Sequence, residues 1–124
     1  MDDVLNLRGL YTSEADKRAG VQLKTLGEDI SAGKVTFPVV KAITRLSKPE
    51  MLSLWEIVRS KPEDPAVVQH CIDVLEGCGA IDACVEQSQQ LVENAFKDLD
   101  PVVPDSFSKI MLRSFGWFVT ERQN

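Results

Sequence analysis

The hydrophobic and polar positions of the chain repeat with the period of an α-helix along most of its length. The clearest pattern lies in residues 80–99, where the positions of one stripe recur at alternating steps of four and three residues. The members of this stripe are Ile81, Val85, Ser88, Val92, Ala95 and Leu99. Such spacing predicts an amphipathic helix that turns one face toward a core.

A last helix is predicted after Pro101 and Pro104, from a cap at Asp105 or Ser106 to about Arg122. The large apolar side chains on one side of it are Phe107, Met111, Phe115 and Phe118. We expect the aromatic side chains Trp55, Trp117, Phe115 and Phe118 to lie in the core rather than to bind a cofactor.

Capping signals divide the middle of the chain into three further helices. Residues 35–46 accept Pro38 in the first turn. The sequence Ser47-Lys48-Pro49-Glu50 has the S-x-x-E form of a capping box and opens a helix to about Ser60. Asp64-Pro65 opens the next helix, which ends at Gly77 and Gly79. The predicted buried faces are Val39, Val40, Ile43 and Leu46, then Met51, Leu52, Trp55 and Val58, then Val67, Val68, Cys71, Ile72 and Leu75.

The amino end predicts a helix in residues 2–10 that stops near Gly9, followed by a long ordered loop in residues 11–33. Loops of that length in compact domains tend to be functional. No strand pattern competes with the helical periods, so the sequence predicts an all-α fold, an antiparallel helix bundle that forms a single helical domain over residues 1–124. Because the first helix has no cap before it, we expect the chain to be cut from a longer one.

Composition and charge narrow the possible functions. The 124 residues are 44% hydrophobic and 27% charged, as in ordinary globular domains. A net charge of −5 argues against general nucleic-acid binding. No apolar run approaches the roughly 20 residues of a transmembrane helix, and the first residues have no signal-peptide pattern. We therefore expect a cytoplasmic location.

The few cysteine and histidine residues argue against a disulfide framework, a zinc site and a catalytic triad. The odd number of cysteines, Cys71, Cys78 and Cys84, indicates reduced thiols. Together with His70, the only histidine, they lack the close cysteine pair of zinc sites. One histidine also argues against a Ser-His-Asp or Cys-His machine. We expect Cys71 to be a buried core residue and assign no catalytic side chain.

Oxygen ligands gather at the amino end. Asp2 lies four residues before Asn6, and Asp3 lies three residues before it. At these spacings the three side chains can project from one side of a helix. Mg2+ prefers such hard oxygen ligands, often one or two carboxylates together with phosphates and water. The alternative is that acidic residues at a helix start simply stabilise the helix dipole.

A second candidate lies in the glycine-containing loop 27–34. Gly27 and Gly33 would let the backbone approach a ligand closely. Lys24 and Lys34 bracket this loop and could hold a diphosphate as point charges. Three further basic residues, Arg8, Lys17 and Arg18, could add positive charge near the loop, although surface positions explain them equally well. The alternative is a polar surface loop with solvated lysines. The loop is not a Walker motif, because a valine follows Gly33-Lys34.

In this order and spacing, D-D-V-L-N (2–6), Lys24 and G-E-D-I-S-A-G-K-V-T-F-P (27–38) resemble the carboxyl-terminal part of the trans-isoprenyl diphosphate synthases. This is the family of farnesyl, geranylgeranyl and longer polyprenyl diphosphate synthases. E-G-C-G-A-I-D-A (76–83) and F-V-T-E-R (118–122) are similar to the family's late helix junction and carboxyl end. The resemblance implies an all-α isoprenoid synthase fold around a deep cavity, with two aspartate-rich motifs that bind Mg2+ and an allylic diphosphate.

By this resemblance, Asp2, Asp3 and Asn6 form the second aspartate-rich motif and bind Mg2+, while Lys24 and Lys34 contact the allylic diphosphate. Metal and lysines would neutralise the departing diphosphate, and isopentenyl diphosphate would then add to the allylic cation. Asn6 stands where the family usually has an aspartate, and a neutral carbonyl should bind Mg2+ less strongly.

The resemblance also implies that family enzymes are more than twice as long and place the first motif upstream of this region. We therefore expect an inactive carboxyl-terminal portion of a prenyltransferase, assembled as a homo- or hetero-oligomer. Two alternatives stay open: a non-catalytic helical partner subunit that binds a complete prenyl diphosphate synthase, and a helical scaffold with a coincidental match.

Overall fold

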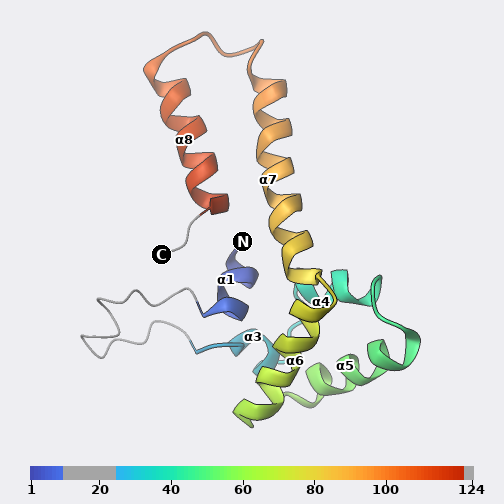
Figure 1. The fold of residues 1–124 in the computed structure, drawn as a ribbon. Coiled ribbons are helices and arrows are strands. Elements are labelled where there is room, and N and C mark those ends of the chain that lie inside the picture. Colours follow the sequence, from blue (N-terminus) through green and yellow to red (C-terminus); the bar gives the residue numbers. More distant parts are fainter. Residues whose placement is uncertain (10–24, 122–124) are drawn as a thin grey trace, which may run out of the picture.

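The computed structural model describes residues 1–9 and 25–121, and within these ranges the regular structure is helical, without strands. The described helices are α1 (Asp2–Arg8), α3 (Glu28–Ser31), α4 (Phe37–Ile43), α5 (Lys48–Ser60), α6 (Pro65–Gly77), α7 (Ala80–Leu99) and α8 (Phe107–Glu121) (Figure 1). This arrangement confirms the predicted all-α fold. In the described ranges, no helix is both long and apolar enough to cross a membrane.

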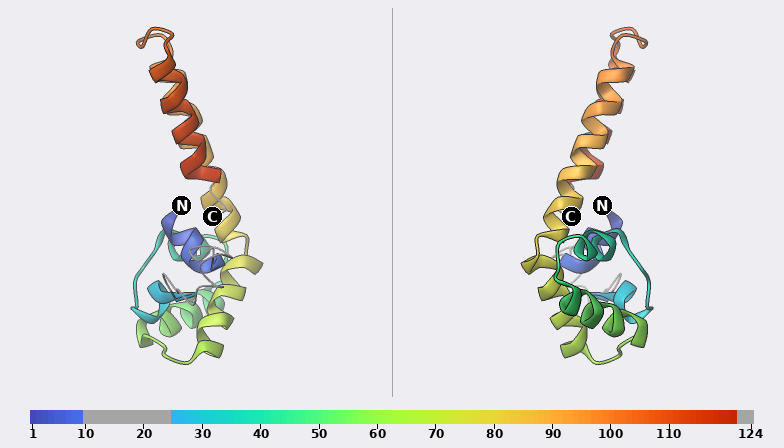
Figure 2. Two further views of the ribbon diagram at one scale, coloured as in Figure 1. Left: turned by 90° about the vertical axis from the view of Figure 1, so that its left-hand side faces the viewer. Right: turned by 90° about the vertical axis from the view of Figure 1, so that its right-hand side faces the viewer.

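The helices form a body and a projection. Helices α1 and α3–α6 gather with the first turns of α7, whereas the rest of α7 extends away from them (Figure 1). Helix α8 returns antiparallel along α7, and the two together make a narrow projection in both side views (Figure 2). We call residues 86–121 the α7–α8 hairpin.

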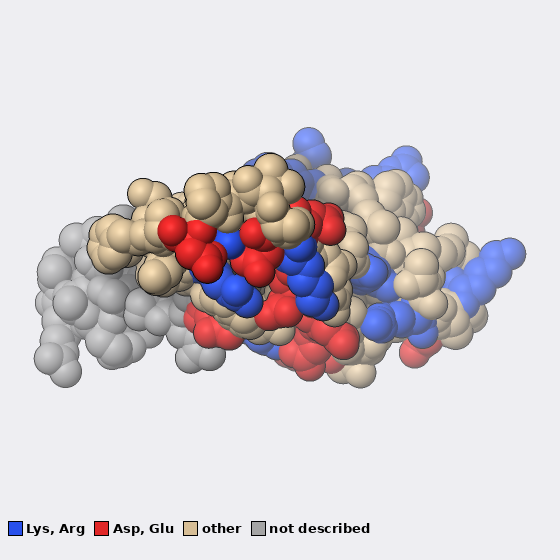
Figure 3. All heavy atoms as spheres, turned by 90° about the horizontal axis from the view of Figure 1, so that it is seen from above, with Lys and Arg blue, Asp and Glu red and all other residues tan. Residues whose placement is uncertain are grey.

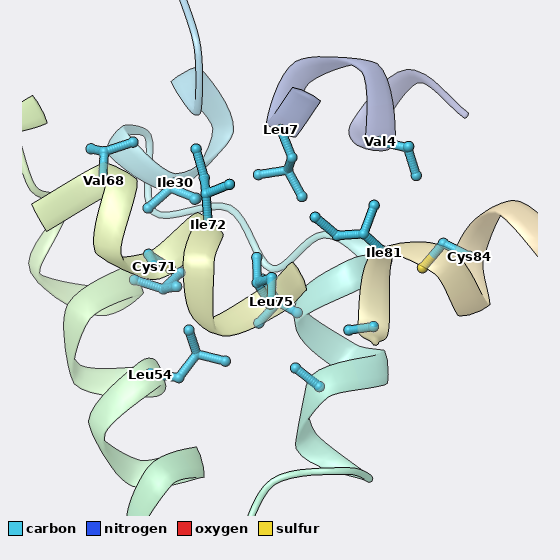
Figure 4. Packing of buried hydrophobic residues seen from close by; sticks show 14 residues of the cluster. Val4, Leu7, Ile30, Leu54, Val68, Cys71, Ile72, Leu75, Ile81 and Cys84 are labelled. Carbon is cyan, nitrogen blue, oxygen red and sulfur yellow. The ribbon is translucent and has the colours of Figure 1, made fainter. Parts of the chain in front are cut away.

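The hydrophobic core is centred on α6. Helix α6 buries Val68, Cys71, Ile72 and Leu75 at a helical spacing. Around them lie Leu54 of α5, Ile30 of α3, Leu7 of α1 and Ile81 of α7 (Figure 4). The face predicted for residues 65–77 is therefore confirmed for Val68, Cys71, Ile72 and Leu75, whereas Val67 is half-buried.

Local signals place the helix ends where the sequence predicts them. Ser47 and Glu50 form a capping box, in which the Glu50 carboxylate accepts hydrogen bonds from the backbone N–H and the hydroxyl of Ser47. The Asp64 carboxylate accepts from Ala66 N at 2.9 Å and starts α6. Gly9, at φ 68°, ends α1. The bounds of α7 coincide with the predicted range of residues 80–99.

Two predicted buried faces are only partly right, because Val58 and Val39 are buried as predicted but other members are exposed. In α5, Leu54 and Val58 lie in the core, whereas Leu52 and Trp55 are exposed. Helix α5 has apolar residues on two adjoining sides, so its periodicity alone does not choose between them. Helix α4 likewise buries Val39 and Ala42 and leaves Val40 and Ile43 exposed.

The core position predicted for the aromatic residues of the last helix is also wrong. Phe107, Met111, Phe115 and Phe118 are all exposed, with Phe115 at 62%. Trp117 is half-buried. Helix α8 packs against α7 at Gly116. A side chain at this position would meet Phe96 and Val92 of α7. The stripe exists as predicted, but it points away from α7.

The predicted loop of residues 11–33 is only partly described. Residues 10–24 lie outside the described ranges. Residues 28–31 form the short helix α3, which the sequence analysis missed, since a single turn is too short to show a period. Gly27, with φ 68°, precedes this turn.

Candidate functional site

The acidic turn at the start of α1 lies against the start of α4. Asp2 is exposed and Asp3 is half-buried. The Asp3 carboxylate accepts a hydrogen bond from Phe37 N at 3.2 Å. This contact satisfies one of the backbone N–H groups that every helix start leaves without an intrahelical partner. Asp3 therefore ties α1 to α4, across 34 residues of sequence.

Asn6 fixes α1 to α3. Its side chain is 2% exposed, its Nδ2 donates to Thr25 O at 3.4 Å, and its Oδ1 accepts from Asp29 N at 3.4 Å. The backbone adds a third contact, in which Gly27 N donates to Asn6 O at 3.2 Å. The Asn6 amide thus holds the segment that leads into α3.

Lys34 meets the same segment through Asp29. Its Nζ lies 2.6 Å from Asp29 Oδ1, and its backbone N donates to Asp29 O at 2.9 Å. The Lys34 side chain is 62% exposed, whereas the Asp29 side chain is 15% exposed. Asp29 consequently links Asn6 on α1 to Lys34, and it brings two of the predicted site residues to one place. Lys24 lies outside the described residues.

The two glycines of this loop are required by packing within the chain. A Cβ on Gly27 would meet Val68 Cγ1 of α6. A Cβ on Gly33 would lie 2.8 Å from Lys61 Cγ and 3.2 Å from Val58 O. Both residues also have positive φ, 68° and 70°, which other residues rarely adopt. Packing and backbone conformation within the chain therefore explain both glycines. The predicted approach of a ligand to the backbone is not needed to explain them.

Arg8 forms ion pairs with acidic residues of α6 and α7. Its guanidinium lies 3.0 Å from Glu76 Oε1 and 2.6 Å from Asp82 Oδ1. The hydrogen bond to Glu76 is the main cause that raises the pKa of Arg8. Arg8 therefore joins α1 to α6 and α7, rather than adding positive charge to the lysine loop.

An open hollow of about 270 Å³ lies beside Asp3, where α1, α4 and α7 meet. Its walls are Met1, Asp3, Val4, Phe37, Pro38, Cys84, Gln87, Ser88 and Leu91. Most of these side chains are apolar, and Asp3 is the carboxylate among them. The hollow therefore combines an apolar wall with a carboxylate that could bind a metal ion.

The residues that could have formed a zinc site do not come together. Cys71 and Cys84 are buried, and burial raises the pKa of both thiols, that of Cys71 to about 11. His70 is exposed on α6, beside a different hollow between α5 and α6. Across residues 1–9 and 25–121, no three acidic, histidine or cysteine side chains form a group that could hold a metal ion.

Asp29 is the residue that sequence reasoning missed. It lies inside the loop that the sequence singles out, but its spacing of 23 residues from Asn6 gives no signal of their contact. Its distance of five residues from Lys34 is not a helical pairing either. Only the three-dimensional arrangement identifies it as the link between the two motifs.

The amino-acid sequence is similar to those of several known enzymes. A geranylgeranyl pyrophosphate synthase of Apiospora sacchari is 32% identical over 104 residues, which are 81% of this chain and 28% of that protein. A second such synthase, of Zymoseptoria tritici, is 38% identical over 82 residues, which are 65% of this chain and 21% of that protein. The resemblance to the trans-isoprenyl diphosphate synthases is confirmed.

The match has a limited extent. A geranylgeranyl pyrophosphate synthase of Neocamarosporium betae is 30% identical over 66% of this chain, but over only 22% of its own length. The chain thus spans less than a third of each of these synthases, and it resembles their carboxyl-terminal part. No family model and no solved structure matches the chain.

Proposed function

We propose that the chain is the carboxyl-terminal, diphosphate-binding part of a trans-prenyltransferase that joins isopentenyl diphosphate to an allylic diphosphate. In this proposal the 124 residues act as one helical domain, Asp2 and Asp3 bind Mg2+, and Lys34 contacts the allylic diphosphate. The observation that carries the proposal is the link through Asp29, which holds Lys34 next to the helix that bears Asp2 and Asp3.

The donor set suits magnesium. Mg2+ is usually held by one or two carboxylates, with phosphate oxygens and waters completing its shell. Asp2 and Asp3 supply two carboxylates, and the hydrogen bond from Phe37 N takes up only part of the acceptor capacity of the Asp3 carboxylate. A bound Mg2+ would stabilise the negative charge that develops on the departing diphosphate.

The contacts of Asn6 within the chain give it a structural role, whether or not it also binds a metal ion. Its buried amide holds Thr25 and Asp29, and so sets the distance between α1 and Lys34. That Asn6 is a third metal ligand stays a prediction. The same is true of a diphosphate contact by Lys24, which lies outside the described residues.

Lys34 has the chemistry that its proposed role needs. An ammonium group has three N–H donors, and the Lys34 side chain is 62% exposed, so a diphosphate oxygen can approach it from solvent. The neighbouring Asp29 carboxylate also keeps the ammonium oriented. The apolar hollow beside Asp3 would accept the hydrocarbon part of the allylic substrate.

The proposal assigns this chain part of an active site, because the synthases it resembles are more than three times as long as the matched region. We therefore expect no product from the isolated chain with isopentenyl and farnesyl diphosphates. Catalysis would require the remaining part of a synthase, in a homo- or hetero-oligomer or in one polypeptide.

The test is a chimera in which this chain replaces the corresponding segment of the Apiospora sacchari synthase. Asp2→Asn should lower product formation by about 10²-fold or more, and Lys34→Gln by about tenfold, because each removes charge that stabilises the departing diphosphate. The matched controls Asp98→Asn and Lys48→Gln, at exposed positions in α7 and α5, should leave the rate unchanged. Equal rates in all four variants would refute the site.

The alternative, a non-catalytic subunit that binds a complete synthase, gives a different result. Mixing the chain with the intact Apiospora sacchari synthase would then alter product length, and Asp2→Asn would not diminish that effect. No association with the intact enzyme would eliminate this alternative.

A further inference from the structure

Helix α8 turns its apolar side away from the rest of the molecule. The side chains concerned are between 41% and 76% exposed. They are Phe107, Ile110, Met111, Leu112, Phe115, Phe118 and Val119, and we call this set the α8 outer face. Monomeric proteins rarely expose so many large apolar side chains together, and such patches mark interaction sites.

The side of α8 that meets α7 is small or charged. A Cβ on Gly116 would lie 2.8 Å from Phe96 Cε2, so the helices touch closely there. Thr120 is buried, and the Arg113 guanidinium lies 5.8 Å from the centroid of the Phe96 ring. An amphipathic helix normally buries its apolar stripe. Helix α8 instead turns its small and charged side toward α7 and its apolar side outward. This arrangement indicates that another element packs on the outer face.

The two basic side chains of α8, Lys109 and Arg113, are engaged by α7 and by the loop that connects the two helices. Lys109 Nζ lies 3.0 Å from Asp100 Oδ1 and 2.9 Å from Asp105 Oδ1, and it donates to Val103 O at 2.9 Å. Its hydrogen bond to Asp105 is the main cause that raises the pKa of Lys109. Figure 3, seen from above, shows acidic and basic side chains interspersed on the near part of the molecule, with uncharged side chains beside them.

The pattern of the outer face suits another helix. Phe107, Met111, Phe115 and Val119 follow one another at steps of four residues. Rows at this spacing form the ridges that interdigitate when two helices pack. The outer face carries no charged side chain, so the complementary surface is an apolar stripe rather than an acidic or a basic one.

The comparisons indicate where such a helix would come from. The chain spans 28% of the Apiospora sacchari synthase, so more than two thirds of that protein has no counterpart here. A membrane surface fits less well, because interfacial helices need basic residues free for lipid. Lys109 pairs with acidic groups, Arg113 stacks on Phe96, and the net charge is −5.

We propose that the α8 outer face is the docking surface for an apolar-faced helix in the remaining part of a prenyl diphosphate synthase. The identity of the partner rests on the proposed function, whereas the surface itself rests on different residues from the diphosphate site. Docking would cover the apolar stripe and would hold the hairpin against the completed enzyme.

The experiment is co-expression of the chain with an Apiospora sacchari synthase that lacks the corresponding segment. In the test variant, Ile110→Gln, Phe115→Gln and Phe118→Gln are combined. In the matched control, Val40→Gln, Leu52→Gln and Trp55→Gln replace exposed apolar residues of α4 and α5. We expect the wild type and the control to co-purify with the partner, and the test variant to lose co-purification by about tenfold or more.

Three outcomes would overturn the proposal. The test variant could co-purify as well as the control. The wild-type chain alone could form a dimer that the test variant abolishes, with no partner bound. It could instead pellet with phosphatidylcholine–phosphatidylserine vesicles through the same residues. Should the truncated partner aggregate, thermal unfolding of the chimera replaces co-purification, and the test variant must then lower the Tm more than the control does.

The same series separates this proposal from the proposed function. Asp2→Asn must dock like the wild type, since Asp2 is not part of the outer face. Failure of docking with normal loss of activity in Asp2→Asn overturns the docking surface alone. Normal docking, with no effect of Asp2→Asn on the chimera's activity, overturns the diphosphate site alone.

Discussion

The body around α6 and the α7–α8 hairpin are both built from amphipathic helices, but they use their apolar faces differently. Every member of the main buried cluster lies between Val4 and Cys84. Of the residues of α8, only Thr120 is buried. The comparison teaches that periodicity determines that a segment is helical and which side is apolar, but not what that side meets.

The difference has an energetic consequence. Burial of apolar surface contributes about 25 cal/mol per Å², so the side chains around Leu75 stabilise the body, whereas those of the α8 outer face contribute little until something covers them. Segments with few buried apolar contacts open at low free-energy cost. Within residues 1–9 and 25–121, the hairpin is therefore the part that would gain most stability if a partner covered its apolar side.

The largest expected effect comes from truncating one side chain in each region. Leu75→Ala removes a fully buried side chain, at 0% exposure, and should lower the free energy of unfolding by about 2–5 kcal/mol. Phe115→Ala, at an exposed position, should change it by less than about 0.5 kcal/mol. Urea unfolding followed by circular dichroism measures both. Equal losses would show that α8 buries its outer face in the isolated chain.

A smaller effect is expected from glycines that differ in crowding. Gly27 and Gly79 have the same positive φ, 68° and 69°, but a Cβ on Gly27 would meet Val68, whereas a Cβ on Gly79 meets nothing within 4 Å. Gly79→Ala should cost about 1–2 kcal/mol from backbone strain alone. Gly27→Ala should cost more, because the buried α6 must also shift. The reverse order in urea unfolding would contradict the described packing of α3 on α6.

The third expected effect is a pH dependence that belongs to the body. Burial raises the pKa of Cys71 to about 11 from the ordinary thiol value of 9.0. The unfolded chain therefore loses this proton first, so the contribution of the thiol to stability is complete below pH 9 and is lost as the pH rises from 9 to 11. Burial also raises the pKa of Cys84.

Unfolding in urea at pH 8 and pH 10.5 measures this dependence, and Cys71→Val should reduce it. A thiol reagent should modify the half-buried Cys78 before Cys71. Modification of Cys71 at the rate of Cys78 would contradict the burial of the α6 face.

What the sequence predicts well depends on local interactions. The capping box of Ser47 and Glu50, the cap at Asp64 and the range 80–99 are each determined by residues within a few positions of one another. The choice of Leu54 over Leu52 in α5 depends instead on contacts with other helices, which periodicity does not contain.

The candidate site divides in the same way. Asp2, Asp3, Asn6 and Lys34 are evident from residue type, spacing and family resemblance. Their connection through Asp29 is not evident, because it joins residues 23 positions apart. The orientation of α8 could not be predicted either, since Gly116 selects the side that faces α7 by close approach rather than by hydrophobicity.

The most direct test of the account is a nuclear magnetic resonance titration of the isolated chain with Mg2+ and inorganic diphosphate. The account predicts that amide shifts appear in residues 2–8 and 28–37 only when both are present, with a Kd on the order of millimolar, and that Asp2→Asn and Lys34→Gln abolish them. Shifts that are absent at saturating concentrations, or that centre on Lys48 and Lys109 instead, would contradict it.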